Sequence, residues 1–106
     1  KAIRRQRQMC IRDRAYEQSL ENIEPVKYPC TIGSLEGSAD IFIDSPVISK
    51  MHACLLKEDD KFYIEDMNST NGTYINDERI AMHSKTRIAD GDILRVAAYN
   101  FKVCIS

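Results

Sequence analysis

The chain has 106 residues, of which 43% are hydrophobic and 29% are charged, which is the size and composition of one soluble globular domain. It contains no secretory signal and no apolar run near the roughly 18 residues that a membrane helix requires. Its net charge of -1 combines a basic start, with six basic and one acidic residue in positions 1–14, and an acidic remainder of nine basic and fifteen acidic residues. Because an acidic domain repels a phosphate backbone, the composition argues against nucleic acid as a partner.

The four cysteines lie far apart, without a Cys-x-x-Cys pair or a histidine at a zinc-ligand spacing. We therefore expect no metal site, and no motif calls for a cofactor. Cys54 and Cys104 stand inside apolar runs, where a reduced thiol behaves as a small hydrophobic group. This usage is typical of a reduced, cytoplasmic protein rather than of a disulfide-bonded one.

Residues 1–25 differ from the rest and predict a basic tail or linker that is irregular or helical. They are rich in Arg and Gln, and their apolar residues are too scattered to form a helical stripe. Residues 9–14 also resemble a peptide found in translated sequencing-adapter reads, which would make part of this tail foreign to the natural protein. We assign no function to it.

From Val26 onward, short apolar or alternating runs are separated by Gly, Asn, Asp or Pro every eight to twelve residues. This pattern predicts one all-β domain over residues 26–106, an antiparallel sandwich of two twisted sheets. The candidate strands are residues 30–32, 40–43, 52–57, 61–66, 73–75, 93–96 and 99–105.

Two polar loops precede strands, at residues 47–53 and 68–76, and together they suggest a binding edge. The spacing of Ser49 and His52 raises nucleophilic catalysis as an alternative. A hydrolase would also need an orienting acid and an oxyanion hole, and neither these nor a Gly-x-Ser-x-Gly elbow is visible. We therefore expect a binding protein and not an enzyme.

Five motifs in chain order resemble the forkhead-associated domain family over residues 28–106. They are Thr31-Ile32-Gly33-Ser34, Ala39-Asp40-Ile41-Phe42-Ile43, Ile48-Ser49-Lys50-Met51-His52-Ala53, Ser69-Thr70-Asn71-Gly72-Thr73 and Ala89-Asp90-Gly91-Asp92-Ile93-Leu94. Each is weak alone, but five in the right order are specific. The resemblance implies a two-sheet sandwich whose loops at one end bind phosphothreonine peptides.

By this resemblance, the phosphopeptide would be held by Ser34, Ser49, Lys50, Thr70 and Asn71. Hydroxyls and a cation suit a phosphate dianion, because several donors can converge on its oxygens. An amide side chain both donates and accepts, so Asn71 would hold the peptide main chain in register.

The resemblance assigns structural support of the site to Gly33, His52 and Gly72. His52 would connect the two binding loops without touching the ligand, and Gly72 would let its loop turn.

The chain departs from the family pattern at two of the positions expected to contact the phosphate. Ser34 stands where the family typically has an arginine, and Lys50 stands where arginine is common. Losing a charge-assisted hydrogen bond of this kind costs about 1.5–3 kcal/mol, or roughly tenfold to more than a hundredfold in affinity. Pro25 and Pro29 also limit the family's usual first strand to a short edge at most.

The sequence therefore predicts a phosphothreonine-peptide-binding module of a larger bacterial-type, cytoplasmic signalling protein, which recruits a partner phosphorylated by a Ser/Thr kinase. The alternative is a degenerate domain of the same fold that docks proteins without phosphate, motivated by Ser34 and the acidic surface.

Overall fold

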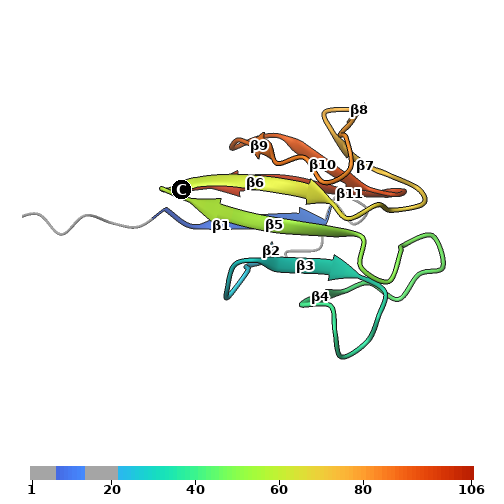
Figure 1. Cartoon of the computed structure of the whole chain (residues 1–106). Helices are drawn as coiled ribbons and strands as arrows, with labels where there is room; N and C mark the ends of the chain where they lie inside the picture. Colours follow the sequence, from blue (N-terminus) through green and yellow to red (C-terminus); the bar gives the residue numbers. More distant parts are fainter. Residues whose placement is uncertain (1–6, 14–21) are drawn as a thin grey trace, which may run out of the picture.

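The computed structural model describes residues 7–13 and 22–106, which form strands and loops without a helix (Figure 1). The strands are β1 (Met9–Asp13), β2 (Asn22–Ile23), β3 (Cys30–Gly33), β4 (Ile41–Phe42), β5 (Ala53–Glu58), β6 (Lys61–Asp66), β7 (Thr73–Ile75), β8 (Glu78–Arg79), β9 (Thr86–Ile88), β10 (Ile93–Val96) and β11 (Tyr99–Ile105). Over these residues, no helix is long and apolar enough to cross a membrane.

The strands form two sheets, which confirms the predicted sandwich. One sheet has the order β2-β1-β11-β10-β7-β8 and the other has the order β4-β3-β5-β6-β9. All pairings are antiparallel except that of β3 with β4, where Ile32 lies opposite Ile41 and Gly33 opposite Phe42. This pair is parallel because residues 34–40 bring the chain back to the level of Ile32 before β4 begins.

The core lies between the sheets and follows the period-two pattern of the strands. In β6, Phe62 and Ile64 are buried while Lys61, Tyr63 and Glu65 are not. In β11, Phe101 and Val103 are buried in the same alternating way. One apolar face per strand is thus sufficient to build this sandwich.

The first strand differs from the sequence prediction. Residues 9–13, expected to be irregular or helical, form β1 and pair along β11 from Met9 opposite Ile105 to Asp13 opposite Phe101. The buried side chains of Met9 and Ile11, two positions apart, cover the core at an edge of β11 that would otherwise be unpaired. The sheet therefore includes residues ahead of position 26; residues 1–6 and 14–21 of the expected tail lie outside the described part of the chain.

Two tight turns are built by pairs of residues with positive φ. These are Asp59 and Asp60 between β5 and β6, with φ of 49° and 64°, and Asn76 and Asp77 between β7 and β8, with φ of 50° and 69°. Asp and Asn tolerate this region better than other non-glycine residues. The second turn creates β8, which was expected to be part of a connection because two charged residues show no apolar alternation.

The loops that matter for function gather at one end of the sandwich. Strands β3 and β6 end there and β5 and β7 begin there, at the right-hand side of Figure 1. Loops 34–40, 43–52 and 67–72, which are far apart in sequence, therefore share this end.

Candidate functional site

The two polar loops are joined directly by hydrogen bonds. The backbone N–H of Thr70 donates to Ser49 Oγ at 3.1 Å. One residue further, Asn71 Nδ2 donates to the carbonyl of Val47 at 2.7 Å. Residues more than twenty positions apart in sequence thus form one continuous edge.

His52 lies beneath this edge and connects the same loops. It is fully buried, its Nδ1 accepts the Ser49 N–H at 3.0 Å, and its Nε2 lies 2.8 Å from the carbonyl of Gly72. Since one partner can only donate and the other can only accept, the ring is neutral with its hydrogen on Nε2. Both ring nitrogens are used in holding the loops, so His52 has no capacity left for a ligand.

The loop after β3 packs against the loop that carries Ser49 and Lys50 and so borders the same edge. Ser34 N–H donates to the Ser49 carbonyl at 3.1 Å, and Leu35 N–H donates to the Lys50 carbonyl at 3.3 Å. This approach requires Gly33, because a Cβ at that position would lie 2.0 Å from the Lys50 carbonyl oxygen. The hydroxyl of Ser34 donates to the carbonyl of Ile48 at 2.8 Å, so its single hydrogen is already used within the loop.

A hollow of about 530 Å³ lies between these loops. It brings together all five residues that the sequence predicted to bind a ligand. Its lining consists of Ser34, Pro46, Val47, Ile48, Ser49, Lys50, Thr70 and Asn71, without an acidic side chain. The three predicted support residues do not line it.

Several hydrogen-bonding groups in this hollow remain available to a ligand. Ser49 Oγ accepts from Thr70, which leaves its own hydrogen free to donate. Lys50 is exposed and is absent from the ion pairs of the described residues. The amide of Asn71 uses one N–H on Val47 and keeps its oxygen and its second hydrogen. These groups can bind an anion and the main chain of an extended segment beside it.

Asp66, which the sequence analysis did not single out, organises the loop that carries Thr70 and Asn71. Its buried carboxylate accepts from the backbone N–H and hydroxyl of Ser69 and from the hydroxyl of Thr73. Burial tends to raise the pKa of Asp66, but these hydrogen bonds outweigh it and hold the pKa below its ordinary value. The signal in the sequence was the Asp-x-x-Ser spacing, which allows a carboxylate to bond to the backbone three residues on.

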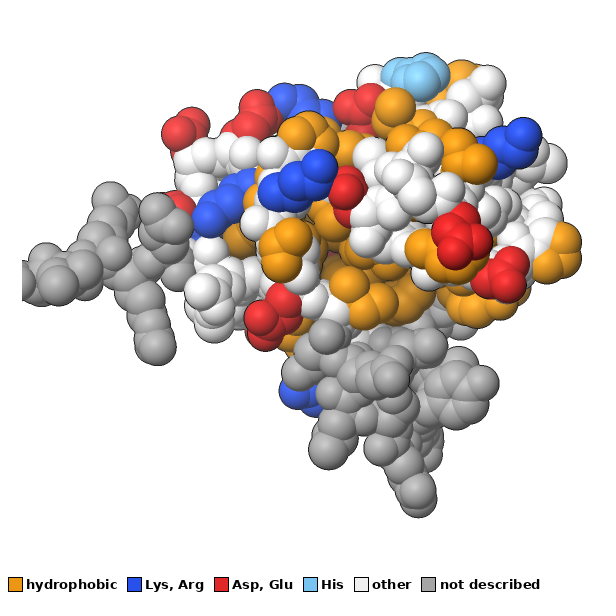
Figure 2. All heavy atoms as spheres, turned by 90° about the horizontal axis from the view of Figure 1, so that it is seen from below, with side chains coloured by type: hydrophobic (Ala, Val, Ile, Leu, Met, Phe, Trp, Pro, Cys, Tyr) orange, Lys and Arg blue, Asp and Glu red, His pale blue; other side chains and the backbone are white. Residues whose placement is uncertain are grey.

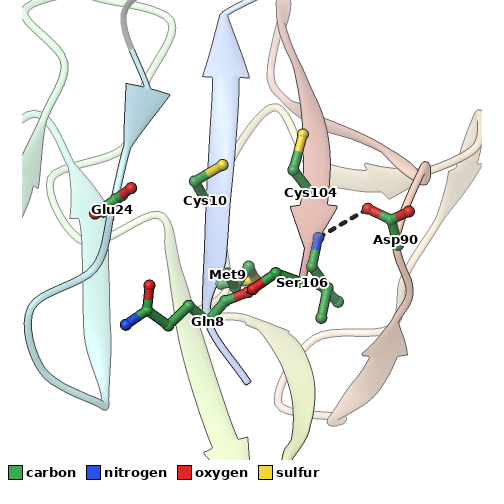
Figure 3. A pocket seen from close by; sticks show the side chains of 8 residues that line it. Gln8, Met9, Cys10, Glu24, Asp90, Cys104 and Ser106 are labelled. Carbon is green, nitrogen blue, oxygen red and sulfur yellow. Dashed lines mark hydrogen bonds between the residues drawn. The ribbon is translucent and has the colours of Figure 1, made fainter. Parts of the chain in front are cut away.

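Another hollow, of about 240 Å³, lies beside β1 and the end of β11 and shares no lining residue with the first (Figure 3). Cys10 and Cys104, which stand opposite each other on β1 and β11, line it.

Elsewhere in the sandwich, burial raises the pKa of the Cys30 thiol to about 11, so this thiol is protonated near neutral pH. All four cysteines are free, and the described residues contain no group of three or more potential metal ligands.

The surface carries no concentrated basic area on the face drawn in Figure 2. Lys and Arg side chains there are interspersed with acidic and hydrophobic ones.

A model of the FHA (forkhead-associated) domain family matches residues 30–97, which contain the whole loop edge. The chain belongs to the FHA domain family. The resemblance seen in the motifs is thereby confirmed.

Two curated relatives extend the comparison. The chain is 35% identical over 75 residues to the transcriptional regulatory protein EmbR of Mycobacterium tuberculosis, covering 71% of this chain and 19% of EmbR. It is 41% identical over 51 residues to the protein FraH of Nostoc sp., covering 48% of this chain and 18% of FraH. The chain thus spans about a fifth of the length of these two relatives.

The structure of M. tuberculosis EmbR in complex with a low-affinity phosphopeptide superimposes with a TM-score of 0.83 and 29% identity, covering 93% of this chain and 24% of that chain. The N-terminal FHA domain of S. cerevisiae Rad53p, in complex with a phosphothreonine peptide, superimposes with a TM-score of 0.80 and 17% identity, covering 93% of this chain and 94% of that domain. At that identity, the second likeness concerns the fold alone.

Proposed function

We propose that this FHA domain binds phosphothreonine peptides in the hollow between its loops. The observation that carries the proposal is the lining of that hollow: Ser49, Lys50, Thr70 and Asn71 contribute hydrogen-bond donors, and no carboxylate opposes an anion there. A phosphate dianion needs several converging donors, and this lining supplies them. The phosphopeptide complexes of EmbR and Rad53p, two proteins of the same fold, support the choice of ligand.

In the proposed complex, the free hydroxyl hydrogen of Ser49 and the Lys50 ammonium contact the phosphate, together with the hydroxyl of Thr70. Asn71 holds the peptide backbone through its unused amide oxygen and hydrogen. Ser34, whose hydrogen is donated to Ile48, mainly shapes the loop. The phosphate grip is then one cation weaker than in family members with arginine at that position, so main-chain recognition by Asn71 contributes a larger share of the affinity.

Fluorescence anisotropy tests the proposal with one peptide in three forms, carrying phosphothreonine, phosphoserine or unmodified threonine. We expect binding to the phosphothreonine form, and we expect Ser49→Ala and Asn71→Ala each to weaken it by about tenfold, the loss of one or two hydrogen bonds. Thermal melts of the same variants show whether they remain folded. Equal binding of phosphorylated and unmodified peptides, or no binding at millimolar peptide, would refute the proposal.

The second candidate function is phosphate-independent docking, favoured by the serine at position 34 and its internal hydrogen bond to Ile48. The variant Ser34→Arg separates the two functions. A phosphate-binding hollow should gain about tenfold in affinity for the phosphothreonine peptide, because a guanidinium adds a bidentate charge-assisted contact. A surface used only for docking unphosphorylated protein should show no such gain.

For the protein as a whole, we propose a cytoplasmic signalling role in which the domain recruits a target of a Ser/Thr kinase. The proposal assigns recognition, and not catalysis, to this domain.

A further inference from the structure

Three side chains from neighbouring strands form a row on the outer face of the six-stranded sheet. Tyr74 on β7 lies opposite Arg95 on β10 and opposite Arg79 on β8. Directly opposed residues point to the same face of a sheet, so the tyrosine lies between two arginines. The guanidinium carbon of Arg95 lies 3.8 Å from the centre of the Tyr74 ring, a close cation–π contact. We call these three residues the Arg–Tyr–Arg row.

The row adjoins the candidate peptide site. A Cβ placed on Gly72 would lie 2.8 Å from Nε of Arg79 and 3.1 Å from Cε1 of Tyr74, so both side chains lie against that glycine. Gly72 directly follows Asn71, the residue proposed to hold the peptide backbone. Thr70 and Gly72 are two positions apart, with Asn71 alone between them, so at most about 7 Å of chain joins them, which is the length of about two residues of an extended peptide.

The charge of the row is not neutralised within the described part of the chain. The ion pairs there join Lys27 to Asp40, His83 to Glu65 and Lys85 to Glu58, and none includes an arginine.

Asp66 lines a hollow of about 410 Å³ together with Arg79. Its carboxylate accepts hydrogen bonds from Ser69 and Thr73, and it is not among the ion pairs of the described residues. Among the described residues, the side chain of Arg95 makes one long hydrogen bond, of 3.4 Å, to the carbonyl of Ala97.

We infer that the Arg–Tyr–Arg row binds a second anionic side chain of the same partner, a carboxylate or a phosphate within about three residues of the phosphothreonine. This rests on the proposed function. Arginine suits such a ligand because its planar fork binds both groups through two parallel hydrogen bonds. Stacking on Tyr74 holds the Arg95 guanidinium in place, which lowers the entropy lost when the anion binds. In this domain Ser34 cannot bind an anion as an arginine would. Arg79 and Arg95, on the outer face of the six-stranded sheet, thus supply part of the positive charge that contacts the partner.

The test measures anisotropy with a reference phosphothreonine peptide that carries alanine at four positions on either side. Each position is then replaced in turn by glutamate or by phosphoserine. We expect one position within three residues of the phosphothreonine to raise the affinity about threefold to tenfold, with less gain at high salt. The double variant Arg79→Ala, Arg95→Ala should lose this gain while its affinity for the reference peptide stays within about twofold.

Two further variants make the result specific. Arg87→Ala removes an exposed arginine that lies opposite Tyr63 on the other sheet, and it should keep the full gain. Arg79→Glu should instead prefer a lysine at the selected position, a reversal that loss of folding cannot produce. The glutamate and phosphoserine arms show which anion is preferred.

The outcomes separate this inference from the proposed function. Phosphate-dependent binding without any acidic preference, or an acidic preference that survives in the double variant, overturns the role of the row alone. Absence of phosphate-dependent binding by the wild-type domain overturns both.

Discussion

At the scale of residues, the loop edge contains two kinds of polar side chain: some hold the loops together, and others keep hydrogen-bonding groups free for a ligand. His52 and Asp66 are buried and spend their hydrogen-bonding capacity on the two loops. Ser49 and Asn71, in contrast, keep unused donors facing the hollow. A buried polar group without hydrogen-bond partners destabilises the fold, so His52 and Asp66 must keep their partners in the loops. Ser49 and Asn71 are not under this constraint and are available to bind a ligand.

The variant Asp66→Asn tests the structural role of the Asp66 carboxylate through the pH dependence of the unfolding free energy. The pKa of Asp66 in the folded state is held below its ordinary value of 3.8, so its ionised form stabilises the fold above that pH, and this stabilisation is lost as the pH falls through the folded-state pKa. We expect the variant to lose about 1–3 kcal/mol of unfolding free energy at pH 7, because an amide cannot accept all the hydrogen bonds from Ser69 and Thr73. Urea denaturation between pH 7 and pH 3 should show the difference from wild type shrinking on acidification.

The control for this measurement is Asp77→Asn, a change at an exposed turn position with φ of 69° that asparagine tolerates. It should stay within about 0.5 kcal/mol of wild type at pH 7. A constant difference between Asp66→Asn and wild type across the whole pH range would contradict the role given to the Asp66 carboxylate.

At the scale of elements, the site depends on how closely β3 approaches the loop before β5. Gly33 lies at the end of β3, where the Lys50 carbonyl leaves no space for a side chain. This close contact allows the Ser34 N–H to donate to the Ser49 carbonyl, which places the loop after β3 at the border of the hollow. The glycine is required here by close packing and not by a positive φ.

We therefore expect Gly33→Ala to destabilise the domain by about 1–3 kcal/mol through overpacking and to weaken phosphopeptide binding by about tenfold or more, since Ser49 and Lys50 must move. Gly37→Ala is the matched control, because its φ is +84° and no atom lies within 4 Å of the added Cβ. It should cost about 1 kcal/mol through backbone strain and leave the affinity unchanged. Thermal melts and anisotropy on both variants measure the two effects; unchanged peptide affinity in Gly33→Ala would rule out this role of β3.

At the scale of the whole molecule, the sandwich is closed by a strand from the start of the chain. β1 joins β11 near the C-terminal end, so residues nearly a hundred positions apart lie side by side, as in the bond from Ser106 N–H to the carbonyl of Gln8. Ile11 is fully buried in the centre of this strand. This pairing makes β1 part of the folded unit, although the sequence around it reads as a basic tail.

Ile11→Ala should consequently lower the free energy of unfolding by about 2–5 kcal/mol, the usual cost of truncating a fully buried isoleucine. Arg12→Ala, on the exposed side of the same strand, should change it by less than about 0.5 kcal/mol. Urea denaturation of the two variants gives the comparison. Equal stabilities would mean that β1 does not belong to the cooperative unit.

Much of the fold and of the candidate site could be predicted because the signals are local. Alternation marks β6, β10 and β11, an apolar run marks β5, and the five motifs stand in an order specific to one family. The five predicted binding residues lie around one hollow, although their roles in binding stay a prediction. The short strands β2, β8 and β9 were missed; in β8, two exposed, charged residues carry no periodicity.

The sequence by itself determined the longer strands from β3 onward, the family and the polar residues of the loops, because side-chain alternation and turn chemistry act over a few neighbouring residues. Only the tertiary structure decided that β1 closes the sheet, that Ser34 spends its hydroxyl on Ile48, and that Tyr74 lies between Arg79 and Arg95. Each of these depends on strand register and on contacts between residues distant in sequence, which no local pattern specifies.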